Sequence, residues 1–301
     1  MNTDIPRRPL GSTGETVSII GIGGAHLSRP DSDKEGIAII RTAIDNGITF
    51  LDNSCDYHEG RSELRMGKAL RDGYRHKAFL MTKFDGHTRT AAEKQIEESF
   101  KRLGTDYIDL LQIHEIIRPS DPDEIFAPGG SIETLLALKK AGKVRFIGFT
   151  GHKHPDIHLK MLDRATAFGV KFDTVQMPLN CLDAHYESFE KKVLPVLAER
   201  GIGALGMKPM AGGGIFRSGA ATARECLQYA MSLPVSTVIT GCESMERLEQ
   251  AIDVARTFLP LTGEERNDIL SRTAPYAGNH ELYKTETIFD GTFHNPQWLK
   301  G

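Results

Sequence analysis

The sequence predicts an α/β fold: a single (β/α)8 TIM barrel with a short β-hairpin before it and an irregular C-terminal extension after it. Eight short runs are rich in apolar and β-branched residues, as is typical of strands buried on both faces of a parallel sheet. Segments with helical periodicity alternate with these runs. No G-x-G-x-x-G motif follows the first run, which disfavours an open dinucleotide-binding sheet. We therefore expect one domain over residues 1–301.

The expected strands are residues 17–24, 48–52, 78–83, 107–114, 144–150, 173–180, 202–209 and 236–241. In the helix expected over residues 33–47, Ile37, Ile40 and Ile44 recur on one face, and Gly47 is placed as a C-terminal stop. The other expected helices are residues 90–104, 132–143, 189–201, 223–233, 244–256 and 263–274.

Two segments lie outside this alternation. Residues 7–17 contain short extended runs around a glycine-containing turn, which predicts a hairpin that closes the bottom of the barrel. Residues 276–301 form a long irregular tail. The tail is rich in aromatic residues, namely Tyr283, Phe289, Phe293 and Trp298. Such residues need a place to be buried, either in the wall of a substrate pocket or against the outside of the barrel or another subunit.

The composition is that of an ordinary globular protein, with 40% hydrophobic and 26% charged residues and a net charge of −3. This balance argues against a nucleic-acid partner or an acidic membrane surface. The chain has no secretory leader pattern and no apolar run of membrane-spanning length, so we expect a cytoplasmic protein. No pattern predicts an oligomeric state. The cysteines are far apart and form neither a disulfide framework nor a metal signature: Cys55, Cys181, Cys226 and Cys242.

Polar side chains end three consecutive predicted strands. These residues are Asp52, Lys83 and His114, and Tyr57 follows Asp52 in the next loop. Because barrel enzymes gather their chemistry at the C-terminal ends of the strands, we expect these four side chains to meet at one mouth. Each could be explained alone by solvation or packing, but their joint occurrence indicates a site.

This set suits carbonyl reduction. A hydride that reaches a carbonyl carbon drives negative charge onto the oxygen, and a proton must be delivered there. A free tyrosine titrates near pH 10, and a neighbouring ammonium would lower the pKa of Tyr57. A carboxylate such as Asp52 would hold Lys83 charged and in place, and His114 would orient the substrate oxygen or assist proton transfer.

The sequence resembles the aldo-keto reductases over nearly its whole length. The resemblance rests on LGSTGETVSIIGIGG, GITFLDNSCDYHEGRSE, LMTKF, DLLQIH, VRFIGFTGH and VITGCESMERLEQAI. It implies an NAD(P)H-dependent reductase of aldehyde, ketone or sugar-like carbonyls, or an oxidant of the corresponding alcohols. By the same resemblance, Asp52, Tyr57, Lys83 and His114 are the catalytic residues, with Tyr57 as the proton donor.

The resemblance also implies an NADP(H) site across the strand ends, with NAD(H) as the alternative. The positions that it assigns to the cofactor are Gly23, Thr150, Gln176, Met207, Lys208, Pro209, Met210, Gly212, Gly241, Arg247 and Gln250. The glycines at 212–214 also suit a loop whose N–H groups approach a pyrophosphate. No metal is expected.

The chain departs from the family pattern at four of these strand ends. Gly151 follows Thr150 where relatives carry an amide side chain, and His152 is a candidate substitute. Met207 stands in the place of a stacking aromatic residue, and Gly241 in the place of a lysine that binds the 2′-phosphate. Ala25 replaces a tryptophan of many relatives, which would open the pocket.

Two other functions fit parts of the sequence. His152, His154 and His158 lie close together after the fifth strand, as in a metal-dependent barrel hydrolase. The carboxylate ligands of such a site are absent from the neighbouring strand ends, apart from Asp52. The resemblance also allows a nucleotide-binding subunit that regulates a membrane channel with little turnover.

Overall fold

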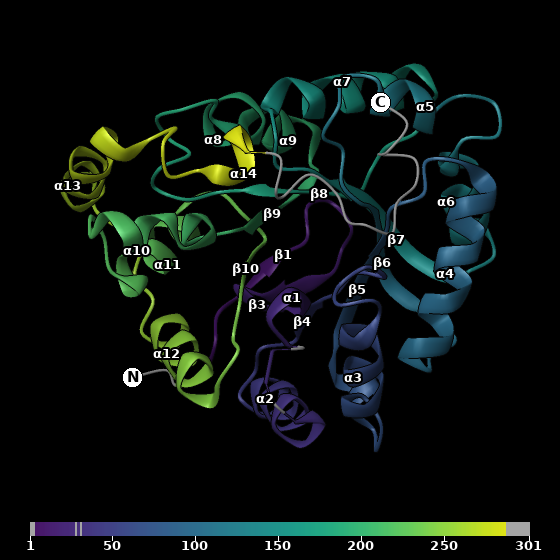
Figure 1. Ribbon diagram of the computed structural model, residues 1–301, viewed down its shortest axis with the longest axis horizontal. Coiled ribbons are helices and arrows are strands. Elements are labelled where there is room, and N and C mark those ends of the chain that lie inside the picture. The colour runs from purple at the N-terminus through teal and green to yellow at the C-terminus, as the bar shows by residue number, and fades with distance from the viewer. Residues whose placement is uncertain (1–3, 28, 31, 287–301) are drawn as a thin grey trace.

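The computed structural model describes residues 4–27, 29–30 and 32–286. Eight parallel strands form a closed barrel in which each strand pairs with the next along the chain, and β10 pairs with β3 to complete the ring. Helices surround this ring, as Figure 1 shows from one end of the barrel. The predicted (β/α)8 barrel is therefore confirmed.

The barrel strands are β3 Ile20–Gly23, β4 Phe50–Asp52, β5 Phe79–Phe84, β6 Ile108–Ile113, β7 Val144–Thr150, β8 Thr174–Pro178, β9 Gly203–Met207 and β10 Thr237–Thr240. Most are shorter than the apolar runs that predicted them. The first run, residues 17–24, is divided between β2 (Thr16–Ser18) and β3, because the chain bends at Ile19 to leave the hairpin and enter the barrel.

The helices that follow the barrel strands are α2 Asp33–Asp45, α3 Arg61–Ala69, α4 Arg89–Leu103, α6 Ser131–Lys140, α7 Pro155–Ala167, α8 Phe189–Lys192, α9 Leu194–Arg200, α11 Ala223–Ser232 and α12 Met245–Arg256. Local signals set their ends. Ser32 caps α2 by accepting a hydrogen bond from the N–H of Glu35, and Gly47 follows the helix with a φ of 92°. In α2 the buried face includes Ile39, Ile40 and Ile44, whereas Ile37 is only half-buried.

The sequence analysis did not identify α3 or α7. The buried face of α3 is largely polar, with Ser62, Glu63 and Arg65, so apolar periodicity is weak there. The apolar residues of α7 do have helical spacing, and this signal was missed. The remaining helices are α1 Gly24–Leu27, α5 Asp121–Ile125, α10 Gly214–Ser218, α13 Gly263–Thr273 and α14 Leu282–Thr285, with 3₁₀ turns at Tyr74–Lys77, Ala211–Gly213 and Ala274–Tyr276.

The N-terminal hairpin closes the end of the barrel where the strands begin. It consists of β1 (Arg7–Pro9) and β2, which pair antiparallel. Leu10 and Val17 are fully buried in the apolar cluster inside the barrel, together with Phe50, Phe79, Met81, Leu110, Leu205 and Ile239. The Arg8 guanidinium donates to the carbonyls of Met231, Leu233 and Val235, just before β10. The predicted closure of the barrel bottom is therefore observed.

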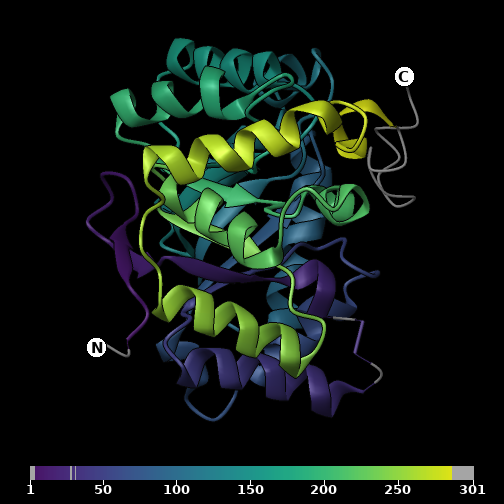
Figure 2. The same cartoon turned by 90° about the vertical axis from the view of Figure 1, so that its left-hand side faces the viewer.

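The opposite end of the barrel is the mouth, where the strands end. Figure 2 shows the hairpin at one end and α14 toward the other. Tyr283 of α14 is buried, with 1% of its surface exposed, and its hydroxyl accepts a hydrogen bond from Asn180 at 3.0 Å. This part of the predicted tail therefore packs on the barrel, whereas Phe289, Phe293 and Trp298 lie outside the described residues. Within the described part of the chain, no helix has the length and apolarity needed to cross a bilayer.

Candidate active site

The loop after β4 carries Tyr57 and is fixed from both sides. The next residues, His58, Glu59 and Gly60, all have left-handed backbone conformations, with φ values of 52°, 60° and 81°. His58 Nε2 lies 3.0 Å from the carbonyl oxygen of Ala25, which joins this loop to α1. Ser62 Oγ makes a second link by donating to the carbonyl of Gly24 at 2.7 Å. The GRSE segment thus holds Tyr57 in place rather than taking part in the chemistry itself.

Lys83 joins Asp52 to Tyr57. Its ammonium lies 2.5 Å from Asp52 Oδ1, 3.1 Å from the Tyr57 hydroxyl and 2.8 Å from the carbonyl oxygen of Asn53. Asp52 and Lys83 are only 2% and 1% exposed. The second carboxylate oxygen of Asp52 accepts a hydrogen bond from Gln176 Nε2 at 2.7 Å. All three donors of the ammonium are therefore used, and its direction toward Tyr57 is fixed.

The pKa of Tyr57 differs from the expectation drawn from the sequence. Burial raises it well above 10, and the negative charges of Asp52 and Glu115 add to the effect. The expected lowering of the Tyr57 pKa is therefore not observed, because burial of the ring, followed by the charges of Asp52 and Glu115, raises that pKa. A tyrosine in this state keeps its proton at neutral pH, which suits a group that must donate it.

His114 follows β6 and lies beside Tyr57. The two rings meet edge to face, with centroids 5.9 Å apart. His114 Nδ1 lies 2.8 Å from Asp85 Oδ1 and 3.3 Å from Ser54 Oγ. Burial alone would lower the pKa of His114, but the hydrogen bond with Asp85 and the charges of Glu115 and Asp85 raise it above its usual value. The predicted group of Asp52, Tyr57, Lys83 and His114 therefore does come together.

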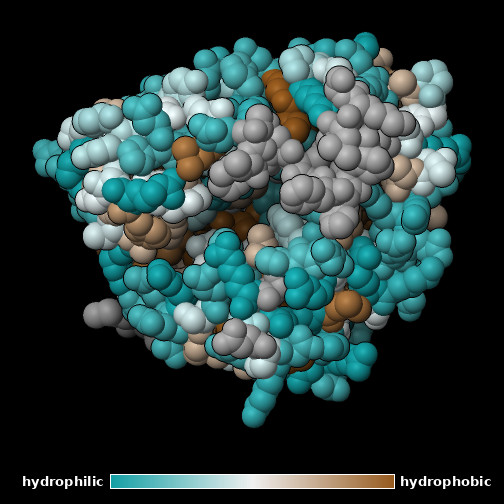
Figure 3. Space-filling model, viewed as in Figure 1, coloured by the Kyte–Doolittle hydropathy of each residue, from teal (hydrophilic) through white to brown (hydrophobic). Residues whose placement is uncertain are grey.

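A cavity of about 530 Å³ opens at the mouth next to this group. Figure 3 shows this end of the molecule, where hydrophilic side chains surround recessed apolar surface. Asp52 and Tyr57 are part of its wall. The predicted cofactor positions that line it are Gly23, Gln176, Met207, Lys208, Pro209, Met210, Gly212, Gly241, Arg247 and Gln250. Thr150 does not line it: the residue is buried, and its hydroxyl lies 3.9 Å from Met207 Sδ.

His26, Arg29 and Glu243 also line the cavity, and the sequence analysis did not single them out. A Cβ atom on Gly241 would lie 2.1 Å from His26 Nδ1, so the imidazole fills the space that a side chain at position 241 would need. Burial, together with the nearby Arg29 guanidinium, lowers the pKa of His26 to about 4, and the ring is neutral at pH 7. Arg29 is paired with Glu243 at 2.7 Å. In the sequence, the glycine at position 241 was the one sign that another side chain could fill this space.

Comparison with known proteins agrees with this geometry. Residues 19–224 match the model of the "Aldo/keto reductase family". The chain belongs to the aldo-keto reductase family. Members of this family are generally NAD(P)H-dependent carbonyl reductases, so the chain is an oxidoreductase.

Individual relatives support the assignment. The chain is 31% identical to L-galactose dehydrogenase of Arabidopsis thaliana over 292 residues, which cover 83% of this chain and 88% of that protein. It is 32% identical to aldo-keto reductase YhdN of Bacillus subtilis over 201 residues, 62% of this chain and 56% of that protein. The holo form of aldo-keto reductase AKR11C1 from Bacillus halodurans has the same fold, with a TM-score of 0.75 at 23% identity over 92% of this chain and 99% of the other.

The cavity of this aldo-keto reductase has polar and backbone features that fit a nicotinamide nucleotide. Gln176 Oε1 is buried and has no hydrogen-bond partner among the described residues, although Nε2 of the same amide is bound to Asp52. The carboxamide N–H groups of a nicotinamide would satisfy that oxygen. The space around Gly212 is open, and Arg247 stands at the N-terminal turn of α12. The fit holds for either nicotinamide nucleotide.

The three histidines after β7 serve different purposes in this reductase. His152 Nδ1 lies 2.7 Å from Glu115 Oε2. His154 caps α7 and lies 3.0 Å from Glu187. His158 is fully buried, with Nε2 3.3 Å from the carbonyl oxygen of Gln176. Their contacts do not form the metal site of the hydrolase alternative.

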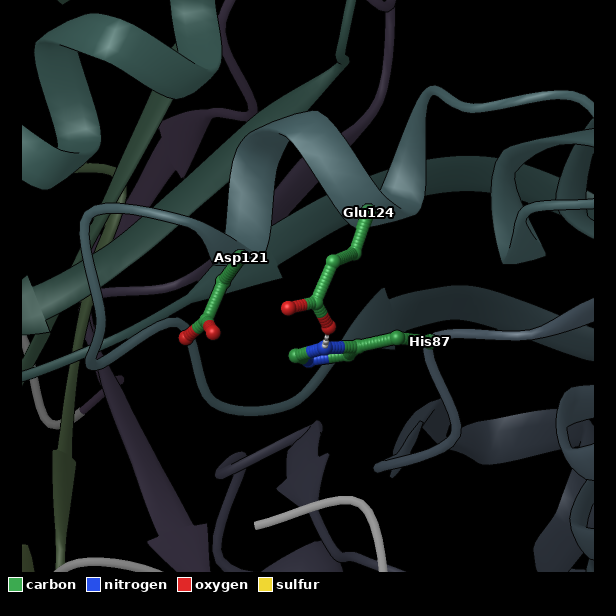
Figure 4. Close-up of side chains that lie close together, drawn as sticks. All are labelled: His87, Asp121 and Glu124. Atoms are coloured by element: carbon green, nitrogen blue, oxygen red, sulfur yellow. Dashed lines mark hydrogen bonds and ion pairs between the residues drawn. The ribbon is translucent and has the colours of Figure 1, made fainter. Parts of the chain in front are cut away.

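Another group of potential metal ligands lies away from the cavity. Figure 4 shows His87, Asp121 and Glu124 side by side, the last two from α5. His87 Nδ1 is 3.1 Å from Glu124 Oε2. Asp121 Oδ2 accepts hydrogen bonds from the N–H groups of Ile117 and Arg118, at 2.7 and 2.8 Å. These contacts fix the segment between β6 and α5, and none of the three side chains is part of the cavity wall.

Proposed function

We propose that this chain interconverts carbonyl compounds and alcohols with a nicotinamide cofactor, and that Tyr57 is the proton donor in the direction of reduction. The observation that carries the proposal is the position of Lys83, whose ammonium touches both Asp52 and the Tyr57 hydroxyl beside the cavity. Tyr57 is protonated before reaction, since its pKa lies above 10, and in this proposal the ammonium of Lys83 stabilises the phenolate that forms afterwards.

The residues then have distinct parts in one step. A bound nicotinamide supplies the hydride. As the C=O double bond gives way to a new C–H bond, Tyr57 transfers its proton to the oxygen, and the O–H bond of the alcohol forms. The phenolate is left against Lys83, whose charge Asp52 maintains, until it recovers a proton from solvent. His114 lies beside the Tyr57 ring, and in this proposal it donates a hydrogen bond to the same oxygen.

The cofactor is NADP(H) in this proposal, with NAD(H) as the alternative. Arg247 lines the cavity and is the cation that would clamp a 2′-phosphate. Two features work against strong selection of the phosphate. Gly241 offers no side chain, and the Glu243 carboxylate lies in the same wall, where it would repel a phosphate or accept a hydrogen bond from a ribose hydroxyl.

The substrate is a small carbonyl compound, and a sugar or sugar-like aldehyde is the best candidate. The relative from Arabidopsis is a dehydrogenase of L-galactose, and the alignment covers most of both chains. Polar groups near the reacting centre, including Lys208 and Asp52, also suit a hydroxylated substrate better than a purely apolar one.

The test is an assay of the purified protein with NADPH and NADH against propanal, glyceraldehyde and a larger aromatic aldehyde. The reverse direction is tested with NADP⁺ and NAD⁺ against L-galactose and other free sugars. We expect turnover that depends on the Tyr57 hydroxyl. Tight binding of the nucleotide without turnover of any compound would favour the regulatory-subunit function instead.

A further inference from the structure

Glu115 and His152 form a buried pair next to the four residues discussed above. Glu115 follows His114 directly and is 8% exposed, and His152 is 1% exposed. Glu115 Oε2 is 2.7 Å from His152 Nδ1. On its outer side His152 meets the ring of Tyr283 edge to face, with centroids 6.2 Å apart. The carboxylate is therefore held by the loop after β7, and that loop is covered by α14.

The distance between Glu115 and His114 decides what the carboxylate can do. Glu115 Oε2 is 3.9 Å from His114 Nε2, which is too far for a hydrogen bond but close for two charges. His114 Nδ1 is occupied by Asp85 Oδ1 at 2.8 Å. Carboxylates therefore lie close to both ring nitrogens, and Nδ1 is the nitrogen that is already hydrogen-bonded.

We propose that Glu115 is a positioning residue of the reaction: fixed by His152, its carboxylate keeps the His114 imidazole in the cationic form beside Tyr57. The inference rests on the proposed function for its role in turnover. A cationic His114 would donate a stronger hydrogen bond to the oxygen as negative charge develops there, and it would keep its own proton while Tyr57 gives up the one that is transferred.

The surroundings of His114 agree with this assignment. Burial and the ammonium of Lys83 from β5 both lower the pKa of the His114 imidazole. Asp85 and Glu115 raise it, and their effect is larger, so the pKa lies above its usual value. Ser54 and Tyr57 from the loop after β4 contribute neutral contacts.

Glu115 itself stays ionised despite its burial. The charge of His152 and its hydrogen bond outweigh the desolvation that would raise the pKa of Glu115, and His114 and Lys208 act in the same direction, so that the pKa falls to about 2. Lys208, after β9, thus adds a further positive charge near Glu115.

The experiment compares the wild-type protein with Glu115→Gln, which keeps the shape and removes the charge. Histidine labelled with ¹⁵N reports the protonation of each imidazole by NMR across pH 5 to 9, and His114→Asn identifies the His114 signal. We expect the His114 pKa to fall in Glu115→Gln, because loss of an opposite charge at this range commonly shifts a pKa by about one or more. Glu133→Gln, at a half-buried position of α6 where the carboxylate pairs with Arg89, is the matched control and should leave the titration unchanged.

Kinetics supply the second readout. As the pH rises, kcat/KM for propanal reduction should begin to fall at a lower pH in Glu115→Gln than in the wild type. Relative to the wild type, the variant should lose on the order of tenfold near pH 8 and much less near pH 6. Glu115→Asp, which retains the charge, should recover most of the activity at pH 8. An unchanged His114 titration in a folded Glu115→Gln protein would overturn the proposal, and so would an equal loss of activity at every pH.

The NMR titration needs no turnover. If the wild-type protein reduces no carbonyl compound, the proposed function fails while the titration still decides whether Glu115 controls the charge of His114. If Glu115→Gln does not fold, His152→Gln is the second variant. It removes the imidazole that fixes the carboxylate, and it should weaken the effect of Glu115 on the His114 titration; no change there would also count against the proposal.

Discussion

Replacement of Gly241 by lysine tests whether the His26 imidazole blocks a phosphate-binding side chain at this position of the cavity. The resemblance described above assigns to position 241 a lysine that binds the 2′-phosphate, and a charge-assisted contact of that kind would contribute about 1.5–3 kcal/mol. Here a Cβ at position 241 would lie 2.1 Å from His26 Nδ1 and 2.5 Å from its Cε1. The backbone of Gly241 is not in the left-handed region, so the imidazole is the obstacle. Moving it costs about 1–3 kcal/mol, as overpacking commonly does.

The two terms are of similar size, so Gly241→Lys alone should gain little affinity for NADPH. His26→Ala removes the obstacle. The double variant, His26→Ala with Gly241→Lys, should bind NADPH at least about tenfold more tightly than His26→Ala alone, with little change in the affinity for NADH. Calorimetric titration of both cofactors against the four proteins measures this, and the coupling between the two positions should exceed about 1 kcal/mol. A single Gly241→Lys variant that gains as much as the double variant would refute the steric argument. A thermal melt of each protein checks that the fold is retained.

The remaining predictions address other parts of the site and the tail. Tyr57→Phe should reduce carbonyl turnover by about 10² or more while NADPH binds within about twofold of wild type, and a variant that keeps most of its turnover would remove Tyr57 from the proton transfer. Arg247→Ala should weaken NADPH by about 1.5–3 kcal/mol more than NADH in the same titration, whereas equal losses would show that Arg247 does not contact the 2′-phosphate. Lys284→Met should lower the free energy of unfolding by about 3–5 kcal/mol, because the buried carboxylates of Asp183 and Glu281, 2.7 and 2.8 Å from the ammonium, lose their partner. The exposed Lys192→Met is its control, and equal denaturation midpoints for the two variants would contradict the argument. Deletion of residues 287–301 should impair reduction of a bulky aldehyde more than that of propanal without lowering the melting temperature, and a lower melting temperature with unchanged specificity would indicate packing instead.

The barrel could be predicted from the sequence because the signals for it are local and repeated. Apolar runs of strand length alternate with helical periodicity, and barrel topology brings the C-terminal ends of all strands to one mouth. That rule alone was enough to place Asp52, Lys83 and His114 together. The Tyr57 loop followed from its position directly after β4.

The electrostatics of the site could not be predicted in the same way. The pKa of Tyr57 depends on how deeply the ring is buried and on the charge of Asp52 beside the lysine, and neither quantity is a property of sequence spacing. Thr150 illustrates the same limit: it stands at the predicted strand end, but it is buried behind Met207 and is not itself part of the cavity wall. His26 lies in the short helix α1 and Glu115 in the loop after β6, and the paths of both segments are set by tertiary contacts.

The hairpin at the bottom of the barrel has a consequence for how the chain is made. Arg8 binds carbonyls that lie up to 227 residues further along the chain, and β3 completes the ring only by pairing with β10. In a nascent chain β3 therefore leaves the ribosome well before β10 has been synthesised, which at about 5–20 residues per second is an interval of roughly ten seconds or more. During that interval β3 has an unpaired edge, and the apolar residues Leu10 and Val17 lack their enclosure. The last third of the chain thus decides when the first becomes protected from aggregation.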